Sequence, residues 1–322
     1  MNPFETTMQN LLTDLKATVM NYARSNEAVT NNRPLVRVDK RGSWVKGFLT
    51  PQSRMPAIAF LPQSERIMSV QTGNRQRVRR TVHVEVFDKG LERDVVVNDL
   101  VKIEEDCREA LKSNPWIRAA DPTRRKTVYN YELLPTRYPE TSQIGDGIVA
   151  SAAFDMVLDS YHTLGDRNLE QTWKATETSS LSESIVAAIQ NNAKAFGTHR
   201  LREVQAVDSL DKAVHMYLPA VGVHPISENW QHVRPGAEDQ SRVFEVWVVS
   251  KLIPKEAALD QVLDLTEEVK NVLQTQFRFG GKAVDSELGM ITYGVESTSL
   301  TLSVRMELFV FSIERMRGVV NS

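Results

Sequence analysis

The 322-residue chain contains a single cysteine and no long apolar run. Cys107 has no partner for an intrachain disulfide, and its apolar position in a helical pattern predicts a buried, unreactive thiol. No stretch approaches the roughly 18 apolar residues of a transmembrane helix. The first five residues lack the basic and apolar regions of a secretory signal. We therefore expect no membrane partner, and a reducing compartment fits the cysteine usage.

The sequence also lacks the motifs of common catalytic and metal sites. It has no Gly-x-Ser-x-Gly elbow and no His-Glu-x-x-His zinc motif. The run Phe279-Gly280-Gly281-Lys282 is only a fragment of a phosphate-binding loop, because the earlier glycine and the Ser or Thr after the lysine are missing. His224 and His232 flank Glu228, but no second cluster of ligands accompanies them. We expect no catalytic residue, no metal and no cofactor.

The net charge of −2 argues against a general polyanion binder. Residues 1–166 carry 23 basic and 21 acidic residues, net +2, whereas residues 167–322 carry 16 and 20, net −4. One basic run stands out, Arg75-Gln76-Arg77-Val78-Arg79-Arg80, and no aromatic residue interrupts it to stack on bases. A loop or strand edge that meets an acidic protein surface explains this run better than sequence-specific binding to nucleic acid.

A long segment of the chain occurs twice. Pro56-Ala57, a short β-like run, Pro62 and Ser64-Glu65 are answered 163 residues later by Pro219-Ala220, a similar run, Pro225 and Ser227-Glu228. From Arg80 against Arg242 to Asn114 against Gln276 the match continues without gaps at an offset of 162. This period is too long for a solenoid, whose repeats are roughly 20–50 residues. The sequence predicts two tandem domains, residues 1–165 and 166–322.

Apolar periodicity predicts the same order of elements in both halves. In the first half, helices are expected at residues 4–22 and 97–111, and strands at 35–38, 44–49, 57–61, 78–87, 127–134 and 148–158. In the second half, helices are expected at residues 181–196 and 254–273, and strands at 220–224, 243–249, 287–293 and 300–313. The prolines that bracket residues 57–61 and 220–224 are expected to end those strands. The predicted fold class is α+β, or mixed α/β, with one mixed β-sheet and two packed helices in each half.

Two polar segments, residues 63–76 and 226–240, are predicted to be long connections and contact surfaces. The residues expected at protein interfaces are Arg66, Arg75, Arg77, Arg79, Arg80, Arg234, Glu238 and Asp239. We expect replacement of Arg75, Arg77 and Arg79 by Ser to impair docking while the fold stays intact.

This order of elements resembles the tail-terminator and tail-completion proteins of tailed bacteriophages, which are close to neck and head–tail joining proteins. The resemblance rests on Pro56-Ala57-Ile58-Ala59-Phe60 with residues 82–87 and 97–111, and again on Pro219-Ala220-Val221 with residues 243–249 and 259–273. Each half resembles one whole family domain. The duplication departs from the family, whose members are single units, and residues 33–55 have no counterpart before the second unit.

The resemblance implies a non-enzymatic structural protein of the virion, assembled in the host cytoplasm. Its copies would form a ring that caps the tail tube and joins it to the neck. The implied partners are other copies of the chain, the tail tube protein and the neck or connector protein, with the tail sheath as a further candidate. The alternatives are another head–tail connector or tail-associated assembly protein, and an α+β enzyme.

The duplication allows a ring of three or six chains. Three chains would present six units to a six-fold tube, whereas six chains would present one unit each and use the other elsewhere. The segment 63–76 is basic and the segment 226–240 carries acidic residues, so six equivalent sites would meet alternating charge. We therefore expect six chains.

Overall fold

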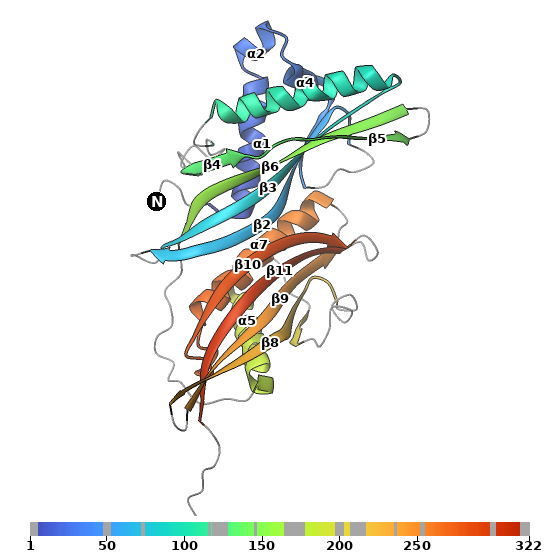
Figure 1. Ribbon diagram of the computed structural model, residues 1–322. Helices are drawn as coiled ribbons and strands as arrows, with labels where there is room; N and C mark the ends of the chain where they lie inside the picture. The colour runs from blue at the N-terminus through green and yellow to red at the C-terminus, as the bar shows by residue number, and fades with distance from the viewer. Residues whose placement is uncertain are drawn as a thin grey trace, which may run out of the picture. The chain divides into compact units, whose positions relative to one another are not determined.

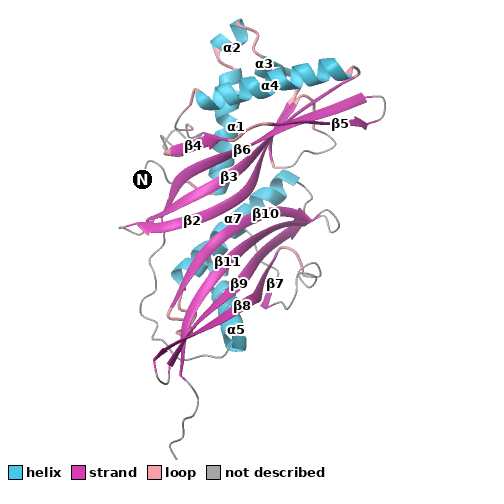
Figure 2. Ribbon diagram, in the orientation of Figure 1, coloured by secondary structure: helices cyan, strands magenta, loops and turns pink. Residues whose placement is uncertain are grey.

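The computed structural model describes residues 6–47, 53–71, 75–114, 117, 128–144, 147–163, 178–196, 203–206, 217–234, 237–251, 255–296 and 301–315. The chain forms two compact units, one of residues 1–69 and 77–162 and the other of residues 70–76 and 163–322. Each unit combines one β-sheet with helices, so the fold is mixed α+β (Figure 2).

The described part of the first unit contains four helices and six strands, most of which are labelled in Figure 1. Its helices are α1 (Met8–Ala23), α2 (Asn26–Thr30), α3 (Pro34–Arg41) and α4 (Arg93–Lys112). Its strands are β1 (Ser43–Lys46), β2 (Ala57–Gln71), β3 (Arg75–Gly90), β4 (Asn130–Leu133), β5 (Arg137–Ile144) and β6 (Gly147–Thr163). The strand order is β4-β6-β3-β2, with β1 beside β2 and β5 beside β6. Strand β1 runs parallel to β2, and β4 and β5 run antiparallel to β6.

The second unit has a five-stranded sheet in its described part. Its helices are α5 (Thr178–Phe196) and α7 (Lys255–Thr275). Its strands are β7 (Glu203–Ala206), β8 (Ala220–Arg234), β9 (Ala237–Lys251), β10 (Asp285–Glu296) and β11 (Thr301–Arg315). The strand order is β10-β11-β9-β8-β7. Only β7 and β8 are parallel neighbours, and the other three pairs are antiparallel.

The four long amphipathic helices lie where the apolar periodicity predicted them. Helix α1 buries Met8, Leu11, Leu15 and Val19, and Thr7 accepts a hydrogen bond from the Asn10 amide as its N-cap. Helices α4, α5 and α7 extend the predicted helical segments by a few residues. Pro254, which was expected to open the last helix, lies outside the described residues. In the first unit the helix count is higher than expected, because α2 and α3 join α1 and α4.

The prediction of a strand at residues 35–38 is wrong, because this segment forms helix α3. Pro34 occupies its first turn, where a missing backbone N–H costs nothing. Contacts with α4 stabilise the helix: the Leu35 amide donates to Asp106, and Arg37 pairs with Asp99 at 2.6 Å. A segment of only four residues, three of them apolar, fits a strand and a short buried helix equally well. Its apolar periodicity therefore could not distinguish the two structures.

The two polar segments predicted as loops are instead the distal halves of long strands. Strand β2 runs to Gln71, and β3 resumes at Arg75 after three residues, too few for a parallel crossover. In the second unit β8 and β9 stay paired from Ala220↔Val249 to Arg234↔Ala237. Backbone hydrogen bonds hold two paired strands together whether their side chains are polar or apolar. A polar sequence therefore does not exclude a strand.

Pro62 and Pro225 lie inside strands β2 and β8 and do not end them as predicted. At Pro225 the pairing with β9 shifts register before Ser227. A β-bulge of this kind accommodates a residue that cannot donate to the ladder. Strand β5, which was not predicted, has a similar shift between Arg137 and Glu140.

The cores lie against the central strands. In the first unit Val82, Val84 and Val86 of β3 are fully buried. The predicted buried thiol is confirmed, because Cys107 of α4 is 0% exposed. Burial raises the pKa of this thiol well above its usual range, which makes it a poor nucleophile. In the second unit Phe244, Val246 and Val248 of β9 form the corresponding buried row.

Candidate interface sites on the two hairpins

An ion pair is fully buried at the middle of the β2–β3 hairpin. Arg80 Nε lies 2.9 Å from Glu65 Oε2, and both side chains are 0% exposed. Arg80 also donates to the Ser160 hydroxyl on β6. Because side chains alternate along a strand, Arg80 shares a face with the buried valines Val82 and Val84. A charge in this position is tolerated only when it is paired.

The Arg80 side chain does not reach the surface of this unit, so it lacks the exposure expected of an interface residue. Its interface role stays a prediction. Arg66 on β2 is exposed, as an interface residue should be. Arg75 lies in β3, and its side chain is outside the described part of the structure.

Arg77 and Arg79 are partly exposed and converge on one carboxylate. Asp159 on β6 is 2% exposed and lies 3.2 Å from Arg77 Nη2 and 2.9 Å from Arg79 Nε. Asn130 is the third side chain that donates a hydrogen bond to it. Burial alone would raise the pKa of Asp159, but the hydrogen bonds from Arg79, Asn130 and Arg77 outweigh it and hold the pKa below its ordinary value.

Two tyrosines border this cluster. The rings of Tyr129 and Tyr161 stack with centroids 4.9 Å apart, and the Arg77 guanidinium lies 5.7 Å from the Tyr129 ring. The side chains of Arg77 and Arg79 remain 37% and 43% exposed. The cluster thus has a buried carboxylate at its centre and cationic side chains at its surface. Because the arginines hold this carboxylate, replacing them with Ser is now expected to lower the stability of the fold.

The β8–β9 hairpin carries a similar ion pair. Arg242 Nε and Nη2 each lie 3.3 Å from Glu228 Oε1, and Gln240 donates to the same oxygen. The Arg242 side chain is 3% exposed, but Glu228 is 32% exposed. The pair in the second unit is thus open to solvent on the side of its carboxylate.

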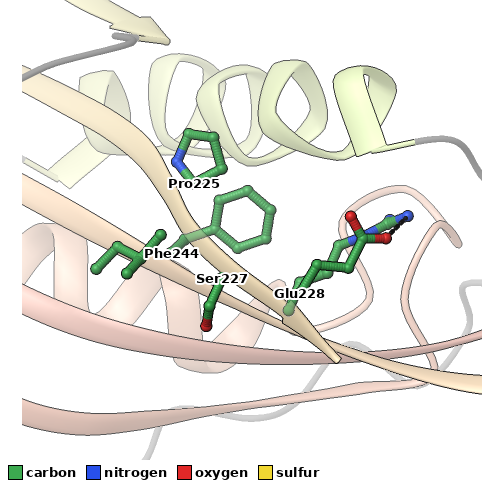
Figure 3. A pocket seen from close by; sticks show the side chains of 6 residues that line it. Pro225, Ser227, Glu228 and Phe244 are labelled. Atoms are coloured by element: carbon green, nitrogen blue, oxygen red, sulfur yellow. Dashed lines mark hydrogen bonds and ion pairs between the residues drawn. The ribbon is translucent and has the colours of Figure 1, made fainter. Parts of the chain in front are cut away.

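A pocket of about 210 Å³ lies beside this pair. Its lining residues are Pro225, Ile226, Ser227, Glu228, Arg242 and Phe244. Figure 3 shows the Phe244 ring between Pro225 and Glu228. The walls are therefore apolar on one side and charged on the other. At this volume the pocket falls below the roughly 300–1,000 Å³ of typical small-molecule sites.

Arg234, Glu238 and Asp239 lie at the distal end of the β8–β9 hairpin. Arg234 pairs with Ala237, and Glu238 and Asp239 lie opposite His232 and Gln231. Their side chains are outside the described part of the structure. Their interface role stays a prediction, as does that of Arg66, Arg75, Arg77 and Arg79.

Sequence reasoning missed the acidic partners of both hairpins. In the sequence match, Glu65 aligns with Glu228 and Arg80 aligns with Arg242, so the recurring charges were a signal for this pairing. Asp159 carries no such signal, because it lies 80 residues from Arg79 and is one acid in an alternating strand.

No three His, Cys, Asp or Glu side chains of the described residues gather as ligands of a metal ion would. Within the same residues, no helix has the length and apolar character needed to cross a membrane. No protein-family model matches the chain, and no curated protein matches it in sequence.

Proposed function

We propose that the chain is a tandem duplication of a tail-terminator-like unit, and that its copies form a ring that caps a bacteriophage tail tube and joins it to the neck. The resemblance of the sequence to this family supplies the function. The arrangement of elements within each unit supports the duplication on which that resemblance depends.

Strand order supports the duplication. Read from the parallel pair onward, the first unit runs β1-β2-β3-β6, and the second runs β7-β8-β9-β11. The parallel pairing starts at the same repeated residue in both, Ser43↔Ala57 in one and Glu203↔Ala220 in the other. In both units a helix, α4 or α7, follows the hairpin. This is the order on which the resemblance rests.

The observation that carries the proposal is the recurring ion pair. Glu65–Arg80 and Glu228–Arg242 join the same two strands at aligned positions of the repeat. A charged pair within a sheet face that is otherwise apolar is uncommon, because desolvation makes it costly. Its recurrence together with the strand order favours two copies of one unit over two unrelated ones.

The proposed mechanism is geometric. Identical head-to-tail contacts generate a ring when their rotation closes. Such a ring would sit on the last ring of the tube, cover its polymerising edge and stop further addition. The hairpins would supply contact surfaces, with Arg66, Arg77 and Arg79 facing an acidic partner. The partners would be the tube, the neck or connector and, in sheathed tails, the sheath, and the protein would stay in the virion.

Native mass spectrometry tests the ring and its copy number. We expect an assembly of six 36.4 kDa chains, because alternating basic and acidic hairpins would not suit six equivalent tube sites. A ring of three chains would show that this charge argument is wrong, although the ring itself would stand. A mass of one chain at every concentration would contradict the proposed ring.

A further inference from the structure

The sheet of the second unit presents two phenylalanines on the face opposite its helices. Helices α5 and α7 contact the strands from the side of the buried row of β9 (Figure 1). Side chains alternate along a strand, so Phe309 and Phe311 of β11 lie on the other face. Phe311 is 40% exposed, and the Phe309 ring lies across Gly289, where an added Cβ would stand 2.5 Å from it. The two rings form an apolar stripe on this face.

Three carboxylates border the stripe. Glu307 precedes Phe309 by two residues and lies directly opposite Glu245 of β9, and Glu287 of β10 lies opposite Phe309. Like charges in a direct cross-strand pair destabilise the sheet. Arg305, on the same face, lies 5.9 Å from the centroid of an indole ring. Within the described residues, none of the three glutamates is in an ion pair, so a cation brought by a partner would relieve their repulsion.

The first unit presents a cation and an apolar side chain with the matching spacing. Arg66 and Met68 on β2 are both exposed, and they share a face because they are two residues apart. Glu307 and Phe309 have the same separation on β11. A guanidinium has enough donors to bind two carboxylates at once, and a thioether makes favourable contacts with an aromatic ring. The pair on β2 therefore complements the pair on β11 residue by residue.

The repeat shows that the two exposed faces differ in charge at these positions. Where the first unit has Arg66, the second has the uncharged Asn229. Where the second unit has Glu245, the first has His83. Each unit therefore lacks the charge that the other presents. Opposite charges favour contact between unlike units over contact between like ones.

We propose that the exposed face of β2 in one copy docks on the open face of β11 in the next copy of the ring. Arg66 would lie between Glu245 and Glu307, and Met68 would pack on Phe309. The acidic partner of the first hairpin is then a second copy of this chain. This inference rests on the proposed ring and names its contact. Because the two surfaces belong to different units, the contact is head-to-tail, and every copy in a closed ring uses both.

Charge reversal on each side of the contact tests the proposal. Arg66→Glu brings three glutamates together, and the variant with Glu245→Arg and Glu307→Arg brings three arginines together. Each is expected to be a monomer in sedimentation velocity under conditions where the wild-type protein forms rings. The variant that carries all three substitutions places one glutamate between two arginines, so it is expected to recover the rings. An equimolar mixture of the two monomeric variants is expected to form rings as well, since every contact then joins opposite charges.

The matched control is Lys102→Glu, which makes the same change in net charge at an exposed position of α4 and should still form rings. Rings from either reversed variant alone would overturn the docking and leave the ring intact. A triple variant and a mixture that both stay monomeric would overturn it too, as would loss of rings in the control. A wild-type protein that never assembles would contradict the proposed ring itself.

Discussion

Replacing Arg80 with Ala is expected to lower the free energy of unfolding by about 3–5 kcal/mol, because it leaves the Glu65 carboxylate buried without its partner. The matched variant in the second unit is Arg242→Ala. Its carboxylate partner, Glu228, is 32% exposed and can be hydrated, so the loss should be clearly smaller. Urea denaturation of the full chain, followed by circular dichroism, measures both.

A double variant distinguishes the effect of an unpaired buried charge on stability from the effect of lost packing. Glu65→Leu combined with Arg80→Met replaces the pair by apolar side chains of similar size, and such replacements are often neutral or stabilising. We expect it to recover most of the stability lost in Arg80→Ala. Equal losses for Arg80→Ala and Arg242→Ala would contradict the difference in burial on which the comparison depends.

The combined variant Arg77→Ser and Arg79→Ser is expected to have a lower free energy of unfolding than the wild type, because Asp159 loses charge-assisted hydrogen bonds whose donors are partly exposed. The effect depends on pH. Since the folded pKa of Asp159 is depressed, its contribution is present above the unfolded pKa and is lost as the pH falls through the folded value. Without the arginines burial is no longer offset, so the folded pKa should rise above the unfolded value. Asp159 should then lower the stability of the variant as the pH increases through that range, the opposite of its effect in the wild type.

Carboxyl NMR titration of Asp159 and urea midpoints across a pH series measure this effect. The control is Arg66→Ser, an exposed position on the same hairpin, which should change stability by no more than about 0.5 kcal/mol. Arg66→Ser is also the better test of docking, because it removes a surface charge without disturbing Asp159. An unchanged Asp159 pKa in the Arg77/Arg79 variant would contradict the assigned contacts.

Long periodic patterns in the sequence predicted the elements well. The stripes of α1 and α4 and the alternation of β3 each extend over many residues, so few other structures could bury them. The prediction of a strand at residues 35–38 was wrong because four residues carry too little periodicity. Contacts with Asp106 and Asp99 on α4 stabilise this segment as a helix.

The prediction of loops at the two polar segments, residues 63–76 and 226–240, was wrong for a different reason. In β2 and β8 the backbone ladder continues beyond the apolar residues, and the charges there are satisfied across the sheet. Glu65 and Arg80 look like solvent-exposed charges in the sequence, yet they are fully buried. Both recur in the sequence as Glu228 and Arg242, but recurrence alone does not indicate that the two charges meet across the sheet. The convergence of Arg77 and Arg79 on Asp159 could not be predicted, because nothing in the sequence brings β3 and β6 together at that point.

The most direct test of the proposed function is the length of the tail tube when this chain is missing. A stop codon early in the chain, in the virus that encodes it, removes the ring that would cover the polymerising edge. Electron microscopy of the infected lysate is then expected to show tubes of uncontrolled length that are not joined to heads, with normal tails restored when the full chain is supplied. Tails of normal length joined to heads in the absence of the chain would contradict its role as a tail terminator.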